Sequence, residues 1–312
     1  MIVDEVTIFI KAGAGGAGNE SSLFMSARRT IGGGGNGGKG GDCIIKVNPH
    51  LYDLSKIVDR HRYLAEAGER GDRNNRKGKD GRTIYIGVPK GTLGFDPAGN
   101  LLFDLDQDGQ EVLICRGGKS GEGNFRKMYT LPPEPGEEKE VILDFRASVE
   151  AAVVGFANCG KTSLVNALTG QNFKVADYPH TTRFCAWARP VGWDFSLMDT
   201  PALKRDCSDP GKDLWFLKHL YRTAVVVLVS DDPVNCRKDF NALVAQILRL
   251  DEELLAGKKL LRVLSKTDLV KKAPRIKDLI KVSATAGKGL KELKDEISAA
   301  VHAAQYDVQS EE

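Results

Sequence analysis

Residues 151–170 read AAVVGFANCGKTSLVNALTG, and this stretch decides the fold of the C-terminal half of the chain. Its centre, Gly155 to Thr162, matches the pattern GxxxxGK[ST] at every required position. The apolar run AAVVGF before the loop predicts a strand, and SLVNALTG after it predicts a helix that stops at Gly170. A strand, a glycine-containing loop and a helix in this order predict a phosphate-binding loop, in which backbone N–H groups and a helix N-terminus surround phosphate oxygens.

The loop also supplies the side chains that a nucleotide phosphate needs. We expect Lys161 to contact the β- and γ-phosphates and the Thr162 hydroxyl to bind Mg²⁺. We interpret Cys159 as a small filling residue rather than a redox centre. The other residues of the loop expected at the nucleotide are Gly155, Phe156, Ala157, Asn158, Gly160 and Ser163.

Two short motifs downstream favour guanine over adenine as the base. Residues 265–268, Ser-Lys-Thr-Asp, end the apolar strand LLRVL and resemble the guanine motif NKxD with serine in place of asparagine. Asp268 would accept two N–H donors that only guanine offers, and Lys266 would lay its aliphatic stem over the base. Without the asparagine amide, Ser265 is expected to weaken affinity by about 1 kcal/mol rather than reverse specificity. A loop that resembles the SAx motif follows another short strand, at Ser283, Ala284 and Thr285.

Strands and helices alternate after the phosphate-binding loop. The apolar runs FSLMD, AVVVLVSD and LLRVLSK predict strands, whereas apolar residues at helical spacing predict helices in 239–254 and 290–301. This alternation predicts a mostly parallel sheet with helices on both sides. Residues 148–305 are therefore expected to form an α/β P-loop GTPase domain, followed by a short polar tail at 306–312.

The first half of the chain is unusual for its glycines. The chain has 34, and they gather in Gly13–Gly18, Gly32–Gly41 and Gly117–Gly123. In the second cluster, glycines recur every three residues in two rows, and polyproline II has three residues per turn. Each row would line one edge of an extended helix that packs backbone to backbone, and a flexible linker is the alternative. Strand-like segments beside the clusters favour a folded all-β domain over residues 1–147, although LPPEPGEEKE at 131–140 has the composition of a domain boundary.

Composition excludes several classes of protein. No run of 18 apolar residues occurs, which argues against a membrane span. The six cysteines form no CxxC pair, which argues against a zinc site and a disulfide framework. The N-terminal residues do not resemble a targeting peptide, so we expect a cytoplasmic protein, with mitochondria and chloroplasts left open. We also expect a monomer.

With these residues placed, the chain resembles the Obg family of ribosome-associated GTPases over residues 1 to about 304. The resemblance rests on KAGAGGAGN, GGNGGKGGD and RGGKSGEGN before residue 147, and on GFANCGKTSLVNALTG, VADYPHTTRF and GKDLWFLKHLYRT after it. It implies a mixed fold, in which polyproline II helices on a β-barrel precede the α/β domain. It also implies hydrolysis of GTP to GDP and a role on the large ribosomal subunit and its rRNA.

The resemblance also assigns residues by position. His180, Thr181 and Thr182 match the switch I segment, and Thr182 would be the second Mg²⁺ ligand; packing or solvent exposure is favoured for His180 over a role as base. Asp199 would hold Mg²⁺ through water, and Ala202 stands where the family has the glycine of DxPG. Leu203 occupies the place of the water-orienting glutamine of Ras-like enzymes. A hydrophobic residue at this place resembles GTPases that use a loop asparagine, here Asn158, to hold K⁺ near the phosphates, so Lys161, Asn158 and Thr182 are the implied catalytic residues.

Two hypotheses follow for activity. In the first, the protein is a slow GTPase that switches in large-subunit assembly, and its basic loop 69–82, with six basic and three acidic residues, contacts rRNA phosphates or is simply solvated. In the second, Ser265, Ala202 and the altered switch II mark a degenerate member that binds nucleotide weakly and holds a place on the ribosome. An ATP-dependent kinase-like enzyme is disfavoured, because Asp268 and the SAx loop would have no role in it.

Overall fold

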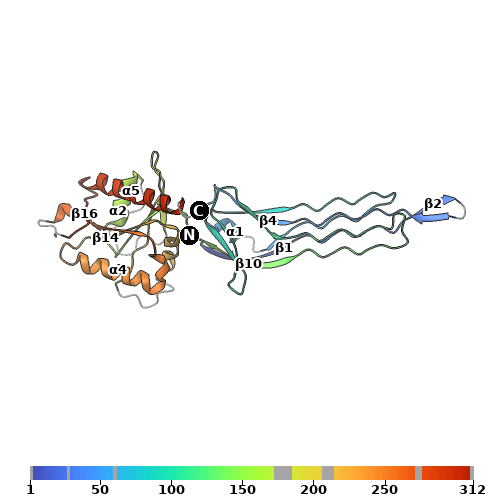
Figure 1. The fold of residues 1–312 in the computed structure, drawn as a ribbon, viewed down its shortest axis with the longest axis horizontal. Helices are drawn as coiled ribbons and strands as arrows, with labels where there is room; N and C mark the ends of the chain where they lie inside the picture. Colours follow the sequence, from blue (N-terminus) through green and yellow to red (C-terminus); the bar gives the residue numbers. More distant parts are fainter. Residues whose placement is uncertain are drawn as a thin grey trace. The chain divides into compact units, whose positions relative to one another are not determined.

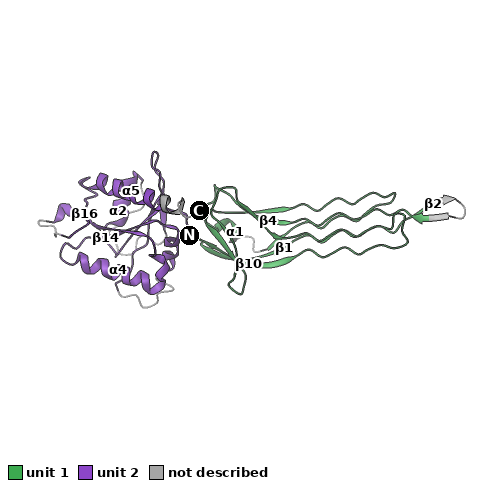
Figure 2. Cartoon of the chain, viewed as in Figure 1, with its two compact units in different colours: residues 1–145 green, residues 146–312 purple. Residues whose placement is uncertain are grey.

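The computed structural model describes residues 3–26, 29–58, 62–171, 185–205, 214–270 and 276–309. The chain divides into two compact units, residues 1–145 and residues 146–312 (Figure 2). The sequence predicts this division after residue 147. No helix within the described ranges is long and apolar enough to cross a membrane.

Two sheets form the base of the first unit. A five-stranded sheet has the order β5–β1–β10–β7–β8, and a three-stranded sheet has the order β6–β4–β9. Alternate residues of β1 point inward, so that Val6, Ile8 and Ile10 are buried while their neighbours face outward. The strands are β1 (Glu5–Lys11), β4 (Cys43–Val47), β5 (Arg62–Leu64), β6 (Ile84–Val88), β7 (Thr92–Phe95), β8 (Leu101–Leu105), β9 (Glu111–Cys115) and β10 (Glu138–Phe145), with the short helix α1 (Ser55–Val58).

Glycine-rich extended segments run out from these sheets to the hairpin of β2 (Ser22–Ser26) and β3 (Arg29–Gly32). Backbone hydrogen bonds join one extended segment to another; for example, the Gly16 N–H donates to the Gly38 carbonyl oxygen at 2.8 Å. The two glycine rows face different neighbours. A Cβ added to any of Gly35, Gly38 and Gly41 would lie 1.9–2.1 Å from a carbonyl oxygen of segment 76–82.

The second row faces the other side. A Cβ on any of Gly34, Gly37 and Gly40 would lie 1.8–1.9 Å from a carbonyl oxygen of segment 13–19. The third row, including Asn36 and Lys39, carries exposed side chains. The predicted three-residue period is therefore a period of contact between backbones, which no residue with a Cβ could make.

One sequence expectation of the first unit is wrong. The stretch 131–140 is not a boundary, because Leu131 exchanges backbone hydrogen bonds with Glu122, the Glu134 N–H donates to the Lys119 carbonyl oxygen, and β10 begins at Glu138. Prolines suit such a segment, since an extended left-handed helix uses no hydrogen bonds of its own. β10 then lies inside the five-stranded sheet, between β1 and β7.

The second unit is built on one six-stranded sheet of order β12–β13–β11–β14–β15–β16. All neighbouring strands are parallel except β12 and β13, as the alternation of strands and helices predicts. The strands are β11 (Ala151–Gly155), β12 (Ala186–Ala188), β13 (Leu197–Asp199), β14 (Val225–Ser230), β15 (Lys259–Leu264) and β16 (Leu279–Lys281).

Helices cover both faces of this sheet (Figure 1). Helices α2 (Lys161–Thr169) and α5 (Leu290–Gln309) bury Leu164, Leu293 and Ile297 in one core with β11, β14 and β15. On the other side, α4 (Cys236–Leu250) buries Phe240 and Leu243. The segment before β14 is a 3₁₀ helix, η1 (Trp215–Arg222); η2 (Glu252–Leu254) and η3 (Thr267–Leu269) are shorter.

Candidate functional site

The phosphate-binding loop has the predicted context. Strand β11 ends at Gly155 and α2 begins at Lys161, and the C-cap of α2 is Gly170 with φ +70°. Two loop residues have left-handed backbone, Asn158 with φ +62° and Gly160 with φ +87°. These reversals turn the chain tightly between the strand and the helix, so that the N-terminus of α2 opens into the loop.

Gly155 is required by its surroundings. A Cβ at this position would lie 2.6 Å from the Val229 carbonyl oxygen and 2.7 Å from the Cys159 sulfur. Cys159 is 1% exposed within the core, and burial raises the pKa of its thiol. It is the filling residue that the sequence predicts, because a buried, protonated thiol is a poor nucleophile.

The Lys161 side chain is hydrogen-bonded to the start of its own loop. Its ammonium donates to the carbonyl oxygens of Gly155 at 3.0 Å and of Phe156 at 2.9 Å, and the residue is only 6% exposed. A buried cation held by two loop carbonyls is positioned where anionic oxygens bound in the loop would meet it. The geometry thus provides one fixed positive charge beside the helix N-terminus.

Oxygen ligands lie next to this charge. The Thr162 hydroxyl donates to Oδ2 of Asp199 at 2.6 Å, which joins α2 to the end of β13. Oδ1 of Asp199 is buried and has no hydrogen-bond partner among the described residues. Burial raises the pKa of the Asp199 carboxyl to about 6, although Thr162 and Lys161 oppose this shift. A hydroxyl and a carboxylate with one uncompensated buried oxygen fit Mg²⁺, which prefers oxygen ligands and would supply the missing charge.

Ser265 and Lys266 fasten the end of β15 to the phosphate-binding loop. The Ser265 hydroxyl, 4% exposed, donates to the Cys159 carbonyl oxygen at 2.6 Å. Lys266 donates to the Asn158 carbonyl oxygen at 2.6 Å and to Asp231 at 2.8 Å. Serine in this motif therefore still connects the loop to the base-reading segment.

A cavity of about 180 Å³ lies beside this connection. The carboxylate of Asp268 stands at the cavity and accepts the Ser283 hydroxyl at 2.6 Å, which holds the pKa of Asp268 below its usual range. Leu164 and Val282 supply apolar surface. A flat base between apolar side chains, with an ionised carboxylate at its edge, fits this arrangement. The lining residues are Gly160, Ser163, Leu164, Ser265, Lys266, Asp268, Leu269, Val282, Ala284 and Thr285.

The segment after Asp199 runs along the loop. The Thr200 hydroxyl donates to the Val153 carbonyl oxygen at 2.8 Å, and the Leu203 N–H donates to the Gly155 carbonyl oxygen at 3.1 Å. Leu203 is 1% exposed and forms a parallel bridge with Phe156. Residue 203 is thus a buried anchor of this segment, with Ala202 held between it and the metal-ligand candidate Asp199.

Three expected site residues, His180, Thr181 and Thr182, lie outside the described residues. The structure brings the remaining ones together at the carboxyl edge of the parallel sheet. It adds Arg205, whose guanidinium binds Asp239 of α4 and lies over the Phe156 ring. Sequence reasoning missed Arg205 because its partners are distant along the chain and no local pattern marks it.

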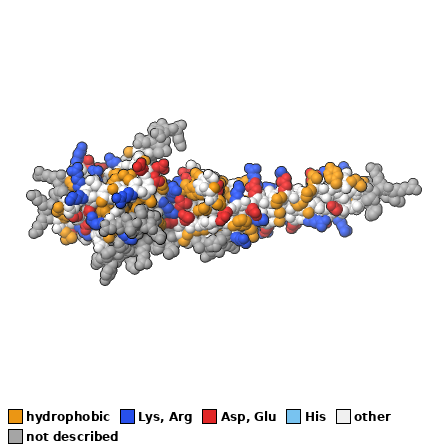
Figure 3. All heavy atoms as spheres, turned by 90° about the horizontal axis from the view of Figure 1, so that it is seen from below, with side chains coloured by type: hydrophobic (Ala, Val, Ile, Leu, Met, Phe, Trp, Pro, Cys, Tyr) orange, Lys and Arg blue, Asp and Glu red, His pale blue; other side chains and the backbone are white. Residues whose placement is uncertain are grey.

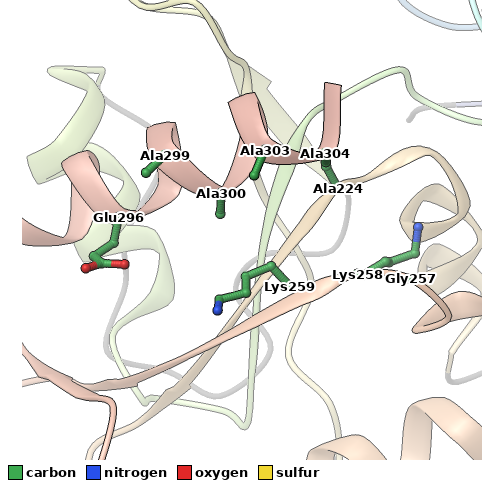
Figure 4. A pocket seen from close by; sticks show the side chains of 9 residues that line it. All are labelled: Ala224, Gly257, Lys258, Lys259, Glu296, Ala299, Ala300, Ala303 and Ala304. Carbon is green, nitrogen blue, oxygen red and sulfur yellow. The ribbon is translucent and has the colours of Figure 1, made fainter. Parts of the chain in front are cut away.

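A second cavity of about 420 Å³ lies where β14 and β15 begin, at the opposite edge of the sheet (Figure 4). Five of its nine lining residues belong to α5, and four of these are alanines. The Lys258 ammonium donates to the Thr223 carbonyl oxygen at 2.6 Å and to that of Tyr221 at 3.1 Å. This cavity has no glycine-rich loop or helix N-terminus, so size alone does not make it the nucleotide site.

Comparisons with known proteins agree with this geometry. The GTP1/OBG family model matches residues 3–147, and the model described as 50S ribosome-binding GTPase matches residues 150–266. The chain is 34% identical to the GTPase Obg of Amoebophilus asiaticus, over 96% of this chain and 97% of that protein. It is 33% identical to the GTPase Obg of Chlorobaculum parvum, over 95% of this chain and 94% of that protein.

Among solved structures, the chain is similar to Era Y63A of Aquifex aeolicus bound to GDP·AlF₄⁻, at 22% identity and a TM-score of 0.40 over 49% of this chain and 56% of that one. It is also similar to the FeoB G-domain of Methanococcus jannaschii, at 25% identity and a TM-score of 0.38 over 49% of this chain and 98% of that one.

Proposed function

Because this chain belongs to the Obg family of GTPases, we propose that it is a GTP-binding switch that hydrolyses GTP slowly during assembly of the large ribosomal subunit. The observation that carries the proposal is the junction of two sites. The phosphate-binding loop and the Asp268 cavity share Gly160, and Ser265 ties them together through Cys159. One molecule with a phosphate chain and a base can therefore occupy both.

Each residue of the junction takes a distinct role in this proposal. The loop amides and Lys161 bind the phosphates, and Asp268 with the loop 283–285 selects guanine. Thr162, Asp199 through water and Thr182, which lies outside the described residues, would hold Mg²⁺, and the metal would neutralise charge on the phosphates. Asn158 is exposed at the turn of the loop, where its side chain can help to hold K⁺. Lys161, Asn158 and Thr182 are the proposed catalytic residues.

Nucleotide titration tests this proposal directly. We expect GDP and GTP to bind with Mg²⁺ far more tightly than ATP, and GTP turnover to be faster in potassium than in sodium salts. Lys161→Ala should remove both binding and turnover. As a matched control, Lys259→Ala deletes an exposed lysine at the start of β15, at the opposite edge of the sheet, and should change neither.

The same titration decides the alternative function. A degenerate member that only holds a place on the ribosome would bind nucleotide without turnover in either salt, and that result would refute the GTPase. The Ser265–Cys159 hydrogen bond supports the active enzyme, because the serine keeps the loop tethered to the guanine motif. A preference for ATP would refute the guanine assignment altogether.

The partner that we propose is the large ribosomal subunit and its rRNA. The family description of the second unit's match, 50S ribosome-binding GTPase, supports this. In the loop 69–82, Arg70, Arg73, Arg76 and Lys79 are exposed and form no ion pair with another described residue. On the face drawn in Figure 3, charges of both signs are spread over the first unit. We therefore expect the cations of the loop 69–82 to attract rRNA phosphates locally, rather than the unit to do so through its total charge.

Sedimentation with ribosomal subunits tests the partner. Binding to large subunits should depend on the guanine nucleotide and should weaken as salt rises, because cations on phosphates release counterions. Replacing Arg73 and Arg76 together by Ala should reduce the salt dependence. Absence of cosedimentation in every nucleotide state would refute the ribosomal role while leaving the GTPase assignment intact. The cytoplasmic location stays a prediction, which cell fractionation tests. The monomeric state also stays a prediction, which analytical ultracentrifugation tests.

A further inference from the structure

We propose that Arg205 is a positioning residue that makes the protein favour GTP over GDP, by holding the segment 200–205 beside the phosphate-binding loop. This inference rests on the proposed guanine-nucleotide site. It assigns a specificity role to four residues that no sequence motif marks. We call Arg205, Ser230, Asp239 and Gln246 the segment anchor.

The centre of the segment anchor is a two-pronged ion pair. Arg205 Nη1 donates to Asp239 Oδ1 at 2.7 Å, and Nη2 donates to Oδ2 at 3.3 Å. Asp239 is 4% exposed and also accepts the Ser230 hydroxyl at 2.8 Å. A buried carboxylate needs such partners, so the position of Asp239 is fixed and it fixes the position of the Arg205 guanidinium in turn.

Two further contacts attach the backbone and the loop to the same point. Gln246 of α4, 7% exposed, donates through Nε2 to the carbonyl oxygens of Lys204 at 2.8 Å and Arg205 at 3.2 Å. The Arg205 guanidinium lies 4.4 Å from the centroid of the Phe156 ring. Phe156 belongs to the phosphate-binding loop, so one side chain joins α4, the segment 200–205 and the loop.

The position of this segment decides which nucleotide it touches. It follows Asp199, which accepts the Thr162 hydroxyl, and its Leu203 N–H donates to the Gly155 carbonyl oxygen. GDP and GTP share the two phosphates that the loop amides would hold, whereas we expect the third phosphate of GTP to lie between Lys161 and this bordering segment. Only GTP therefore gains from contact with the segment around Ala202.

Ordering a chain segment on binding is unfavourable, because backbone freedom is lost. The segment anchor removes that freedom before the nucleotide arrives, so GTP does not have to supply the ordering. Loss of Arg205 should thus weaken binding of a GTP analogue selectively. Because the Arg205 side chain is 61% exposed, we expect the effect of one moderate ion pair, about tenfold in the dissociation constant, rather than loss of binding.

The test compares dissociation constants of GDP and a non-hydrolysable GTP analogue, measured with Mg²⁺ on the full chain. Arg205→Ala should raise the constant for the GTP analogue about tenfold and that for GDP less than twofold. Arg205→Lys keeps the charge but loses the fork, and should fall between. Arg249→Ala removes the same charge from an exposed position of α4 and is the matched control, with no change expected.

A second measurement separates positioning from general stability. Asp239→Asn should reproduce the loss of GTP preference, and adding Arg205→Ala to it should cause no further loss, because both changes break one contact. In turnover, Arg205→Ala should raise the KM for GTP while the inhibition constant of GDP stays the same. A merely structural role would weaken both nucleotides together, and that outcome overturns the inference.

Binding of both nucleotides to the wild-type chain separates a failure of the proposed function from a failure of the positioning role. If it binds neither guanine nucleotide, the proposed function fails and this inference fails with it. If it binds both, and Arg205→Ala keeps the wild-type ratio of the two constants, the positioning role alone is overturned. A ratio shifted in Arg205→Ala and Arg205→Lys but not in Arg249→Ala supports it.

Discussion

Replacing Gly37 by alanine should unfold the glycine-rich array locally while the nucleotide-binding unit stays intact. The new Cβ would lie 1.9 Å from the carbonyl oxygen of Gly16, whereas ordinary contact begins at 3.4 Å. The two segments must therefore separate by about 1.5 Å, the difference of those distances. No rotation of a side chain can relieve this, because the backbone of residue 37 fixes the Cβ and the atom that it meets is a backbone oxygen.

The magnitude follows from the hydrogen bonds that hold the contact. Gly37 donates to the Gly121 carbonyl oxygen at 2.9 Å, Gly121 to that of Gly16 at 2.9 Å, and Gly16 to that of Gly38 at 2.8 Å. A separation of this size takes these bonds out of range, and each contributes about 0.5–1.5 kcal/mol net. We expect Gly37→Ala to lower the free energy of unfolding of the first unit by about 2–4 kcal/mol.

The control is the same chemical change at a roomy site. A Cβ on Gly87, in β6, would find its nearest neighbour at 3.6 Å, which is ordinary contact. Gly87→Ala should therefore change stability by less than about 1 kcal/mol. All three tryptophans, Trp187, Trp193 and Trp215, belong to the second unit, so their fluorescence reports that unit alone.

The assay combines urea unfolding followed by far-ultraviolet circular dichroism, tryptophan fluorescence and amide hydrogen exchange. In Gly37→Ala, the tryptophan transition should be unchanged, while amide exchange at Gly16, Gly121 and position 37, the donors of those three bonds, speeds up. Equal unfolding free energies for Gly37→Ala and Gly87→Ala would refute the reasoning, because the segments would then not be in backbone contact.

Three further predictions concern single groups. Ser265→Ala should weaken GDP binding by about 1–2 kcal/mol, since the Cys159 carbonyl loses its buried donor; equal affinity in calorimetry would contradict this. Asp268→Ala should weaken GDP at least about tenfold and leave ATP unaffected, measured by competition with a fluorescent nucleotide. Burial raises the pKa of the Cys43 and Cys115 thiols to about 11, above their ordinary 9.0, so their stabilisation is complete below pH 9 and is lost as the pH rises through 11. The free energy of unfolding of the wild type, measured by urea denaturation, should fall over this alkaline range. If it falls equally with pH in the variant in which both cysteines are replaced by alanine, the loss does not come from these thiols.

The sequence alone was sufficient where the determinant is local or periodic. The strand, loop and helix around Lys161 are contiguous, so their order along the chain predicts their order in space. The glycine rows also follow from the sequence, because a three-residue repeat reports the turn of a single helix. The stretch 131–140 shows the limit of this reasoning, since prolines and charges suit a linker and an extended packed segment equally well.

Only the tertiary structure decided what those local pieces touch. Ser265 meets Cys159, and Asp268 meets Ser283, because the parallel sheet brings its carboxyl ends to one edge. The pairing of Arg205 with Asp239 depends on how α4 lies beside the segment 200–205, and neither residue carries a motif. Contacts of this kind are set by strand register and helix placement, which are properties of the whole core. The sequence therefore determines that a phosphate-binding loop and a glycine-rich array exist, whereas the fold decides which distant side chains complete the site.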